Sequence, residues 1–194
     1  PDVELKLKEQ DKFVSRGGLK LDHALEHFDL DVQDAIAADL GASTGGFTDC
    51  LLQRGASRVF AIDVGQGQLA WKLRTDERVV VMEKTNARHL KKVHLPSSIN
   101  LIVVDCSFIS LKHILPPAVA LLEQSGSIVA LIKPQFEAGK EEADKGRGVI
   151  RDPILHRQII DSLEQFATEE LPLKWKSVVE SPLLGPAGNK EFLV

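Results

Sequence analysis

Five short apolar runs, each bounded by glycine, proline or charged residues, recur along this chain of 194 residues. The runs are AIAADL at 35–40, RVFAID at 58–63, RVVVM at 78–82, INLIVVD at 99–105 and GSIVALIK at 126–133. Stretches with the apolar spacing of helices separate them. Continuous apolar runs of this length are typical of strands buried on both faces. The alternation predicts an α/β fold with a mostly parallel sheet and helices on both of its faces.

Helices are predicted before and between these strands. The first begins at Ser15, a good N-cap residue, and its apolar positions recur at helical spacing from Leu21 to Phe28. A second covers 47–54 and ends at Gly55, a residue type favoured just beyond helix ends.

The C-terminal part of the chain predicts one more helix and a closing strand pair. Asp152 can cap a helix whose first turn contains Pro153. Two further apolar segments, 174–180 and 190–194, flank the turn-rich sequence LLGPAGN and predict an antiparallel pair. With the five runs, these segments give a sheet of seven strands.

Charge and composition limit the classes of function. Lys and Arg number 24 against 28 Asp and Glu, so the net charge is −4, which argues against a protein that simply coats phosphates. The most apolar stretch, 99–104, is far shorter than the roughly 18 residues of a membrane span. With two cysteines and no metal-ligand spacing of histidines, we expect a cytoplasmic protein without a membrane partner or a metal.

A glycine-rich loop joins the first predicted strand to the helix that follows. Its sequence, GASTGGF, lets main-chain N–H groups and a helix N-terminus approach a ligand closely, although the glycines could also serve only a tight turn. The spacing G-x-x-x-G-G departs from the dinucleotide fingerprint G-x-G-x-x-G. Asp39 precedes the loop, and a carboxylate suits a cationic methionyl group better than a pyrophosphate. The loop therefore favours S-adenosylmethionine over NAD.

Acidic and polar residues near the next strands extend this cofactor site. Asp63 ends the second run, where a carboxylate commonly binds ribose hydroxyls in nucleotide-binding folds. Asn86 follows the third run and is a candidate for the adenine, although asparagine is also a common turn former. The residues predicted to bind the cofactor are Asp39, Gly41, Ser43, Gly45, Gly46, Phe47, Asp63, Asn86 and Asp105.

An acid and an amine end the last two parallel runs. Asp105 and Lys133 should emerge together at the carboxyl edge of the sheet, where ligands bind in open α/β folds. A ribose hydroxyl attacks a methyl group well only after it loses its proton. An amine can accept that proton when burial and a second cation lower its pKa, and Lys20 is the candidate cation. Asp105 and Glu191 would then orient the two amines.

Seven motifs along the chain resemble one family. SRGGLKLDHAL, DLGASTGGFTD, AIDVG, VVDCSFIS, IKPQFEAG, KGRGVIRDP and GNKEF are similar to segments of the haemolysin A (TlyA) branch of the FtsJ-like RNA 2′-O-methyltransferases. The resemblance runs from about Phe13 to the end of the chain. It implies a Rossmann-like methyltransferase fold, S-adenosylmethionine as donor and ribosomal RNA or ribosomal subunits as partner, with a cytidine ribose as target. The family's catalytic tetrad maps onto Lys20, Asp105, Lys133 and Glu191.

The resemblance also bears on domain organisation. Members of this branch carry a small RNA-binding domain before the methyltransferase domain, and residues 1–14 resemble the linker after it. We therefore expect 1–14 to be a leading segment and 15–194 to be the methyltransferase domain, without the RNA-binding domain and a few closing residues.

Basic residues supply candidate RNA contacts. Between Lys72 and Lys92, seven basic and three acidic side chains give a net charge of +4, although a solvated surface is the simpler interpretation for each one. The polar segment 134–150 follows Lys133 and predicts a mobile substrate loop, with plain disorder as the alternative. The residues expected to contact RNA are Arg16, Lys145 and Arg147.

Three other interpretations compete with an RNA ribose methyltransferase. One is a membrane-active haemolysin, as the family name suggests, although no spanning element is evident. Another is a catalytically silent module that binds RNA or cofactor. The third makes Cys106 the nucleophile of a base methyltransferase, but such enzymes place a proline before the thiol, and Asp105 stands there. A buried structural cysteine is the better interpretation of Cys106.

Overall fold

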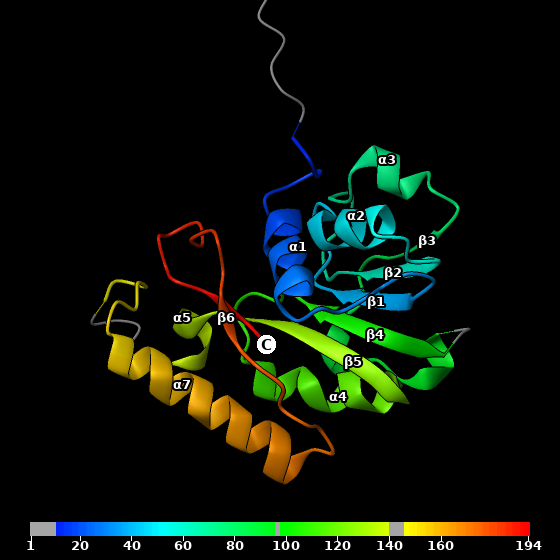
Figure 1. Cartoon of the computed structure of the whole chain (residues 1–194). Coiled ribbons are helices and arrows are strands. Elements are labelled where there is room, and N and C mark those ends of the chain that lie inside the picture. Colours follow the sequence, from blue (N-terminus) through cyan, green and yellow to red (C-terminus); the bar gives the residue numbers. More distant parts are fainter. Residues whose placement is uncertain (1–10, 96–97, 140–145) are drawn as a thin grey trace, which may run out of the picture.

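The computed structural model describes residues 11–95, 98–139 and 146–194. Within them, seven strands form one sheet in the order β3-β2-β1-β4-β5-β7-β6 (Figure 1). The strands are β1 Ile36–Leu40, β2 Arg58–Ile62, β3 Val79–Met82, β4 Ile99–Val104, β5 Leu122–Ile132, β6 Val179–Glu180 and β7 Phe192–Leu193. The first five are parallel, and β7 runs antiparallel to both β5 and β6.

A strand forms within each of the seven predicted segments, with three refinements. The sixth is much shorter than predicted and covers only Val179–Glu180 of the segment 174–180. The fifth begins at Leu122, four residues before the predicted start, and an irregularity between Ile99 and Leu101 interrupts its register with β4. The last two strands do pair with each other, but β7 lies between β5 and β6. The final strand therefore joins the closing pair to the parallel part of the sheet.

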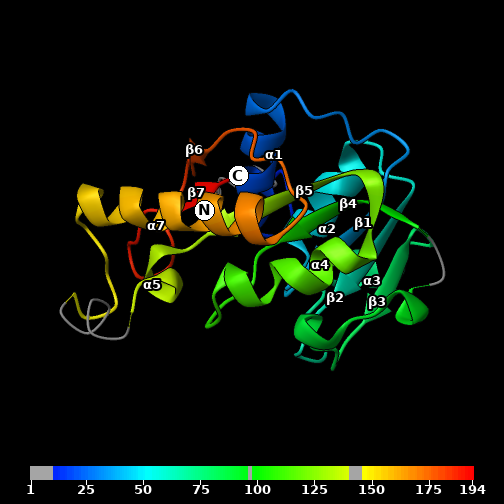
Figure 2. The same ribbon diagram turned by 90° about the horizontal axis from the view of Figure 1, so that it is seen from below.

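Helices cover both faces of the sheet, as predicted (Figures 1 and 2). One core lies between the sheet and α1, α2 and α3, and the other lies between the sheet and α4 and α7. Neighbouring residues along β1 alternate between the two, with Ala37 in the first core and Ala38 in the second. The helices are α1 Gly17–His27, α2 Gly46–Gln53, α3 Trp71–Arg74, α4 Leu115–Leu121, α5 Pro134–Glu137 and α7 Pro153–Gln165.

The predicted helix ends are largely confirmed. Gly55 follows α2 with φ +94°, a conformation that favours glycine. Asp152 caps α7 through its carboxylate, which accepts from the amide of Ile154 at 2.9 Å. The predicted cap of α1 is wrong: Arg16 is the N-cap, and Ser15 contributes only its main-chain carbonyl, which accepts from Gly18. The Ser15 hydroxyl instead lies against Gly46 of the glycine-rich loop, and α1 has no side-chain cap.

The described end of the leading segment packs against α1 and α2. Phe13 is only 4% exposed and belongs to the core on that face of the sheet. Lys12 forms an ion pair with Asp22 of α1 at 2.5 Å, and the amide of Val14 donates to Asp49 of α2 at 2.8 Å. These contacts fix the direction in which the chain enters α1, and α1 carries Lys20.

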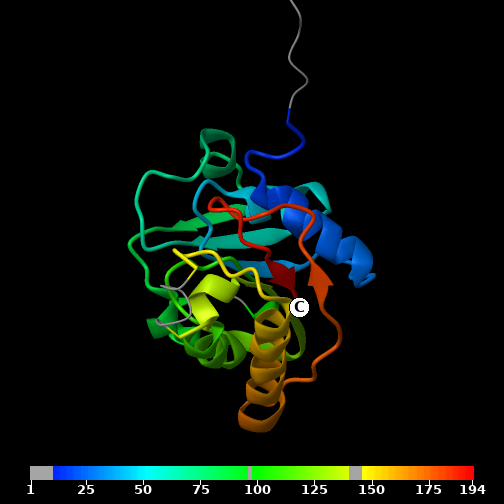
Figure 3. The same cartoon turned by 90° about the vertical axis from the view of Figure 1, so that its left-hand side faces the viewer.

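The C-terminal segment closes the fold beside the same helix. Figures 1 and 3 show it, in red, between α1 and α7, and β7 contacts α1 directly. The end of the chain is thereby brought next to residues near its beginning. In the part of the chain that the structure describes, no helix is both long and apolar enough to cross a membrane.

Replacement of Asp152 by alanine should lower the free energy of unfolding by about 1 kcal/mol, because the amide of Ile154 loses its capping acceptor. Urea unfolding measures the change. Asp161→Ala is the matched control, since Asp161 forms only an exposed ion pair with Arg157 and should change stability by less than about 0.5 kcal/mol. Equal losses for the two variants would contradict the capping role.

Candidate active site

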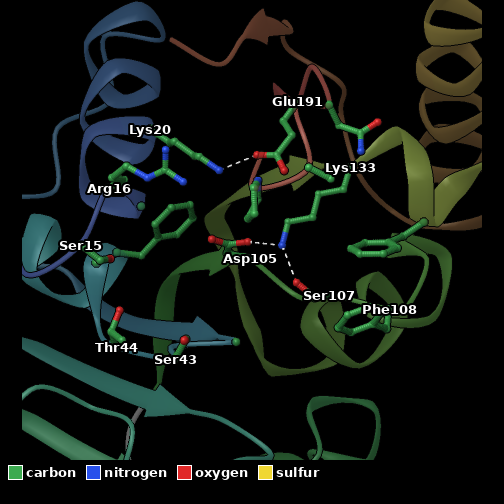
Figure 4. A pocket seen from close by; sticks show the side chains of 18 of the residues that line it. Ser15, Arg16, Lys20, Ser43, Thr44, Asp105, Ser107, Phe108, Lys133 and Glu191 are labelled. Carbon is green, nitrogen blue, oxygen red and sulfur yellow. Dashed lines mark hydrogen bonds and ion pairs between the residues drawn. The ribbon is translucent and has the colours of Figure 1, made fainter. Parts of the chain in front are cut away.

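A pocket of about 710 Å³ lies at the carboxyl edge of the sheet. Its walls come from the start of α1, the glycine loop between β1 and α2, the segments after β4 and β5, and the turn before β7. Because β1, β4 and β5 are adjacent and parallel, their carboxyl ends open on the same side. Figure 4 shows the side chains that line this pocket.

Four charged side chains meet in the pocket as two ion pairs (Figure 4). The Nζ of Lys20 lies 2.5 Å from the carboxylate of Glu191, and the Nζ of Lys133 lies 2.5 Å from that of Asp105. Lys133 also donates to the hydroxyl of Ser107 at 2.9 Å. The side chain of Glu191 is 1% exposed and those of both lysines are 10% exposed. The structure thus brings together all four residues predicted as catalytic, each cation with its own acid.

The glycine loop lies directly against this cluster. Gly41 has φ +91°, and a Cβ there would come within 2.6 Å of the main-chain oxygen of Asp105. A Cβ on Gly46 would come within 2.3 Å of the Ser15 hydroxyl. Glycine is required at both positions because the loop is wedged between α1 and the end of β4. Main-chain atoms of the loop therefore border the pocket, where Ser43 and Phe47 join its lining.

Gly45 lies on the side of the loop that packs against α3. It has φ +96° and caps α2, and a Cβ there would come within 2.2 Å of Leu73 in α3. Its place is therefore explained by packing, and it does not line the pocket.

Asp39 lies beneath the loop and is fully buried. One carboxylate oxygen accepts from the amide and the hydroxyl of Thr48, at 3.0 and 2.7 Å. The other oxygen has no hydrogen-bond partner among the described residues. Burial raises the pKa of Asp39 to about 7; the charges of Asp105 and Asp63 add to the rise, and the bonds from Thr48 oppose it. A buried acid in this state is stabilised by nearby positive charge, which fits a cationic ligand group in the adjoining loop.

The other predicted cofactor residues have structural partners. Asp63 accepts from the amides of Ser43 and Gly65, at 2.8 and 2.7 Å, and so ties the glycine loop to the segment after β2. Asn86 accepts from the amide of Arg88 and caps a short turn. Neither lines the pocket described above. The Asp63 oxygens keep further acceptor capacity, so ribose binding at Asp63 stays a prediction, as does the role of Asn86.

Two phenylalanines that the sequence analysis did not single out stand at the pocket. Phe108 is 91% exposed and has φ +61°, which is strained for a bulky residue. Its ring centroid lies 5.0 Å from that of Phe136, and the Nζ of Lys133 lies 5.9 Å from the Phe136 ring. Exposed aromatic surface held in a strained conformation makes Phe108 a candidate for contact with a ligand. Its only sequence signal is proximity to Asp105 and Lys133, because positive φ cannot be read from a phenylalanine.

Asn189 is another residue without a clear sequence signal. It is 1% exposed, accepts from the amide of Ile150 and donates to the carbonyl of Gly148, both at 2.8 Å. His156 of α7 lies 3.0 Å from the carbonyl of Ile150. These bonds hold the segment before α7 against the residues that precede β7, where Glu191 lies. Gly148, on this segment, lines the pocket.

Two of the three residues predicted to contact RNA are described by the structure, and both are exposed at or near the pocket. Arg16 is exposed and lines the pocket, and Arg147 is exposed beside Gly148. Lys145 lies outside the described residues. In the basic segment, three side chains have acidic partners: Lys72 with Asp49, Arg74 with Glu83 and Arg78 with Asp76. The exposed remainder is Lys84, Arg88, Lys91 and Lys92.

The thiol of Cys106 is half-buried and lies 3.4 Å from the carbonyl oxygen of Leu40. Burial raises its pKa to about 12, with a further contribution from Asp105. A protonated thiol is a poor nucleophile at neutral pH, which agrees with the structural interpretation of Cys106. In the part of the chain that the structure describes, no cluster of three or more His, Cys, Asp or Glu is arranged to hold a metal ion.

Comparison with known proteins adds to this geometry. A family model described as FtsJ-like methyltransferase matches residues 13–194. The 16S/23S rRNA (cytidine-2′-O)-methyltransferase TlyA of Mycobacterium tuberculosis is 48% identical over 184 residues, which cover 94% of this chain and 67% of that protein. The chain spans about two thirds of the length of two curated relatives that it matches.

Solved structures agree with the fold. The crystal structure of a "putative hemolysin" from Lactococcus lactis is 49% identical, with a TM-score of 0.91 over 95% of this chain and 88% of that one. Fibrillarin from Aeropyrum pernix, solved with bound S-adenosyl-L-methionine, is 18% identical, with a TM-score of 0.58 over 84% of this chain and 67% of that one. The fold is thus the Rossmann-like fold of S-adenosylmethionine-dependent methyltransferases.

Replacement of Asn189 by alanine should speed hydrogen exchange at the amide of Ile150 by about tenfold, since that amide loses its acceptor. Exchange followed by NMR measures the rate. The amide of Ile159 in the middle of α7 is the internal control and should keep its protection. Unchanged exchange at Ile150 would show that Asn189 does not hold this segment.

The raised pKa of Asp39 predicts a dependence of stability on pH. Between about pH 4 and 7 the folded chain binds more protons at Asp39 than the unfolded chain, so stability should fall as pH rises through this window. The free energy of unfolding of the wild type, relative to Asp39→Asn, should therefore drop by about 2–4 kcal/mol from pH 4 to pH 8. Urea titrations of both proteins test this. A constant difference between them would exclude the raised pKa.

Proposed function

The chain belongs to the FtsJ-like methyltransferase family, and we propose that it transfers a methyl group from S-adenosylmethionine to the 2′-hydroxyl of a ribose in ribosomal RNA. The observation that carries this proposal is the meeting of Lys20, Asp105, Lys133 and Glu191 in one pocket beside the glycine loop. S-adenosylmethionine, when bound, supplies an electrophilic methyl group on a sulfonium. The chain has to hold that group, bring a hydroxyl into line with it and remove the hydroxyl proton.

We assign proton removal to Lys133. The Nζ of Lys133 would accept the proton of the attacking hydroxyl as the methyl group passes from the cofactor sulfur to the ribose oxygen. Asp105 and Ser107 hold this amine from two sides, so its position is fixed before substrate arrives. Lys20 and Glu191 form the second pair, in which the Lys20 ammonium is placed to stabilise the oxyanion that develops on the ribose.

Cofactor binding falls to the glycine loop and its neighbours. Gly41 and Gly46 permit close approach of the main chain, and Ser43 and Phe47 line the pocket. Asp39 lies below them as a buried acid lacking a partner at one oxygen within the described residues, which favours a cationic methionyl group. Asp63 is the candidate for the ribose of the cofactor and Asn86 for its adenine, as the strand order of the fold suggests.

The proposed acceptor is a cytidine of ribosomal RNA, as in the M. tuberculosis relative. Phe108 offers exposed aromatic surface on which its base can stack, and the half-buried ring of Phe136 packs against it. Arg16 and Arg147 are exposed beside the pocket, where they can contact phosphates. The chain has a net charge of −4, so we expect weak and salt-sensitive RNA binding by these 194 residues. A ribosomal substrate places the reaction in the cytoplasm.

Replacement of Lys133 by alanine should reduce methyl transfer at least about 100-fold, because the proposed base is lost. Transfer of labelled methyl from S-adenosylmethionine to ribosomal subunits measures the rate. Cofactor affinity, measured by isothermal titration, should change by less than about twofold, since the alanine leaves the glycine loop intact.

Lys174→Ala is the matched control, because Lys174 is exposed and lies outside the pocket. It should transfer at the wild-type rate. Undiminished transfer by Lys133→Ala would remove Lys133 as the base. A wild type that binds no S-adenosylmethionine would refute the proposed function as a whole.

A further inference from the structure

Gln135 has a buried amide oxygen without a partner at the pocket. It is the second residue of α5, two positions after Lys133, and it lines the pocket together with Phe136. Its Oε1 is buried, and no described residue donates a hydrogen bond to it. The sequence analysis did not single out this residue, and neither ion pair uses it.

An unpaired buried carbonyl oxygen carries a free-energy cost, because it has lost water without gaining a donor. Asn189 lines the same pocket and also has a buried side-chain amide, but this amide has hydrogen-bond partners. Its oxygen accepts from the amide of Ile150, and its nitrogen donates to the carbonyl of Gly148. The lack of a hydrogen-bond donor to Gln135 among the described residues is therefore confined to the part of the pocket wall that Gln135 lines. Such a feature is expected where a ligand supplies the donor.

The position of Gln135 indicates which ligand that is. Figure 4 shows Phe108 across the pocket from Ser15 and Thr44, with Asp105 and Lys133 between them. Gln135 is adjacent in sequence to Phe136, whose ring packs on Phe108. It therefore belongs to the wall with the exposed aromatic surface, while the glycine loop forms the opposite wall. The donor should come from the acceptor nucleotide rather than from the cofactor.

We propose that Oε1 of Gln135 accepts a hydrogen bond from the exocyclic amine of the acceptor base and so selects cytidine over uridine. This inference rests on the proposed function. Cytosine presents an N4 amine at the position where uracil presents the O4 carbonyl oxygen. A uridine would therefore place a second acceptor against Oε1 and leave both oxygens unpaired. Gln135 is thus a specificity-determining residue, whereas Lys133 acts on the ribose.

Three variants test this role. Gln135→Leu removes the acceptor at similar volume and should reduce methyl transfer to ribosomal subunits by about tenfold or more. Gln135→Glu keeps an acceptor oxygen and should retain more transfer than the leucine variant. Gln165→Leu makes the same chemical change on an exposed side chain of α7 and should transfer like the wild type. Titration with S-adenosylmethionine should give the wild-type affinity for all three, which also reports intact folding.

Base selection is measured by titrating the chain with cytidine 5′-monophosphate and with uridine 5′-monophosphate, followed by NMR. The wild type should prefer the cytidine nucleotide by about fivefold, and Gln135→Leu should bind the two equally. No preference in the wild type, or a preference for uridine, would overturn the inference.

Two failures are distinguishable. If the wild type transfers methyl groups and Gln135→Leu transfers them equally fast, the role of Gln135 is refuted and the proposed function stands. If the wild type transfers none while binding cytidine nucleotide selectively, the proposed function fails and the binding preference of Gln135 remains. Loss of cofactor affinity in Gln135→Leu alone would assign the side chain to the cofactor and overturn the inference.

Discussion

The pairing of two buried lysines with two carboxylates is the interaction on which the site depends. Lys20 and Glu191 stand 171 positions apart in the sequence, yet their charged groups lie 2.5 Å apart. An ammonium with so little exposure needs an acidic partner, and removal of one member of a buried pair typically costs about 3–5 kcal/mol. The first helix and the last strand therefore have to meet. The close packing of Phe13 on Gly18 and the insertion of β7 between β5 and β6 both serve that meeting.

The carboxyl edge of the sheet also positions the other residues of the site. Asp105 and Lys133 follow adjacent parallel strands, so their proximity results from topology and not from any local motif. The glycine loop follows β1 and presses on the main chain of Asp105. The pocket, the glycine loop and the two ion pairs thus all lie at the carboxyl edge of the sheet. In the proposed function, a cationic cofactor would bind beside Asp39 and Lys133 would activate a hydroxyl within this single arrangement.

Much of this arrangement could be predicted from the sequence, for physical reasons. Buried parallel strands carry continuous apolar runs, and the polar residues at their ends mark the edge of the sheet where ligands bind. The sheet and the positions of Asp105 and Lys133 could therefore be predicted from the sequence. Asp152 and Gly55 mark helix ends by local chemistry alone. Features that depend on tertiary contacts could not be predicted from the sequence. These are the left-handed backbone of Phe108, the hydrogen bonds of Asn189 to a distant segment, and the side-chain oxygen of Gln135 that has no partner among the described residues. The N-cap of α1 was misjudged because the Ser15 hydroxyl lies against Gly46, a tertiary contact, instead of capping the helix.

The most direct test of the account is the chemical identity of the methylated product. Ribosomal subunits treated with the chain and S-adenosylmethionine are digested, and the modified nucleosides are mapped by mass spectrometry. We expect a methyl group on the ribose 2′-oxygen of a cytidine. A methyl group on a base, or none on the RNA while the cofactor binds normally, would contradict it.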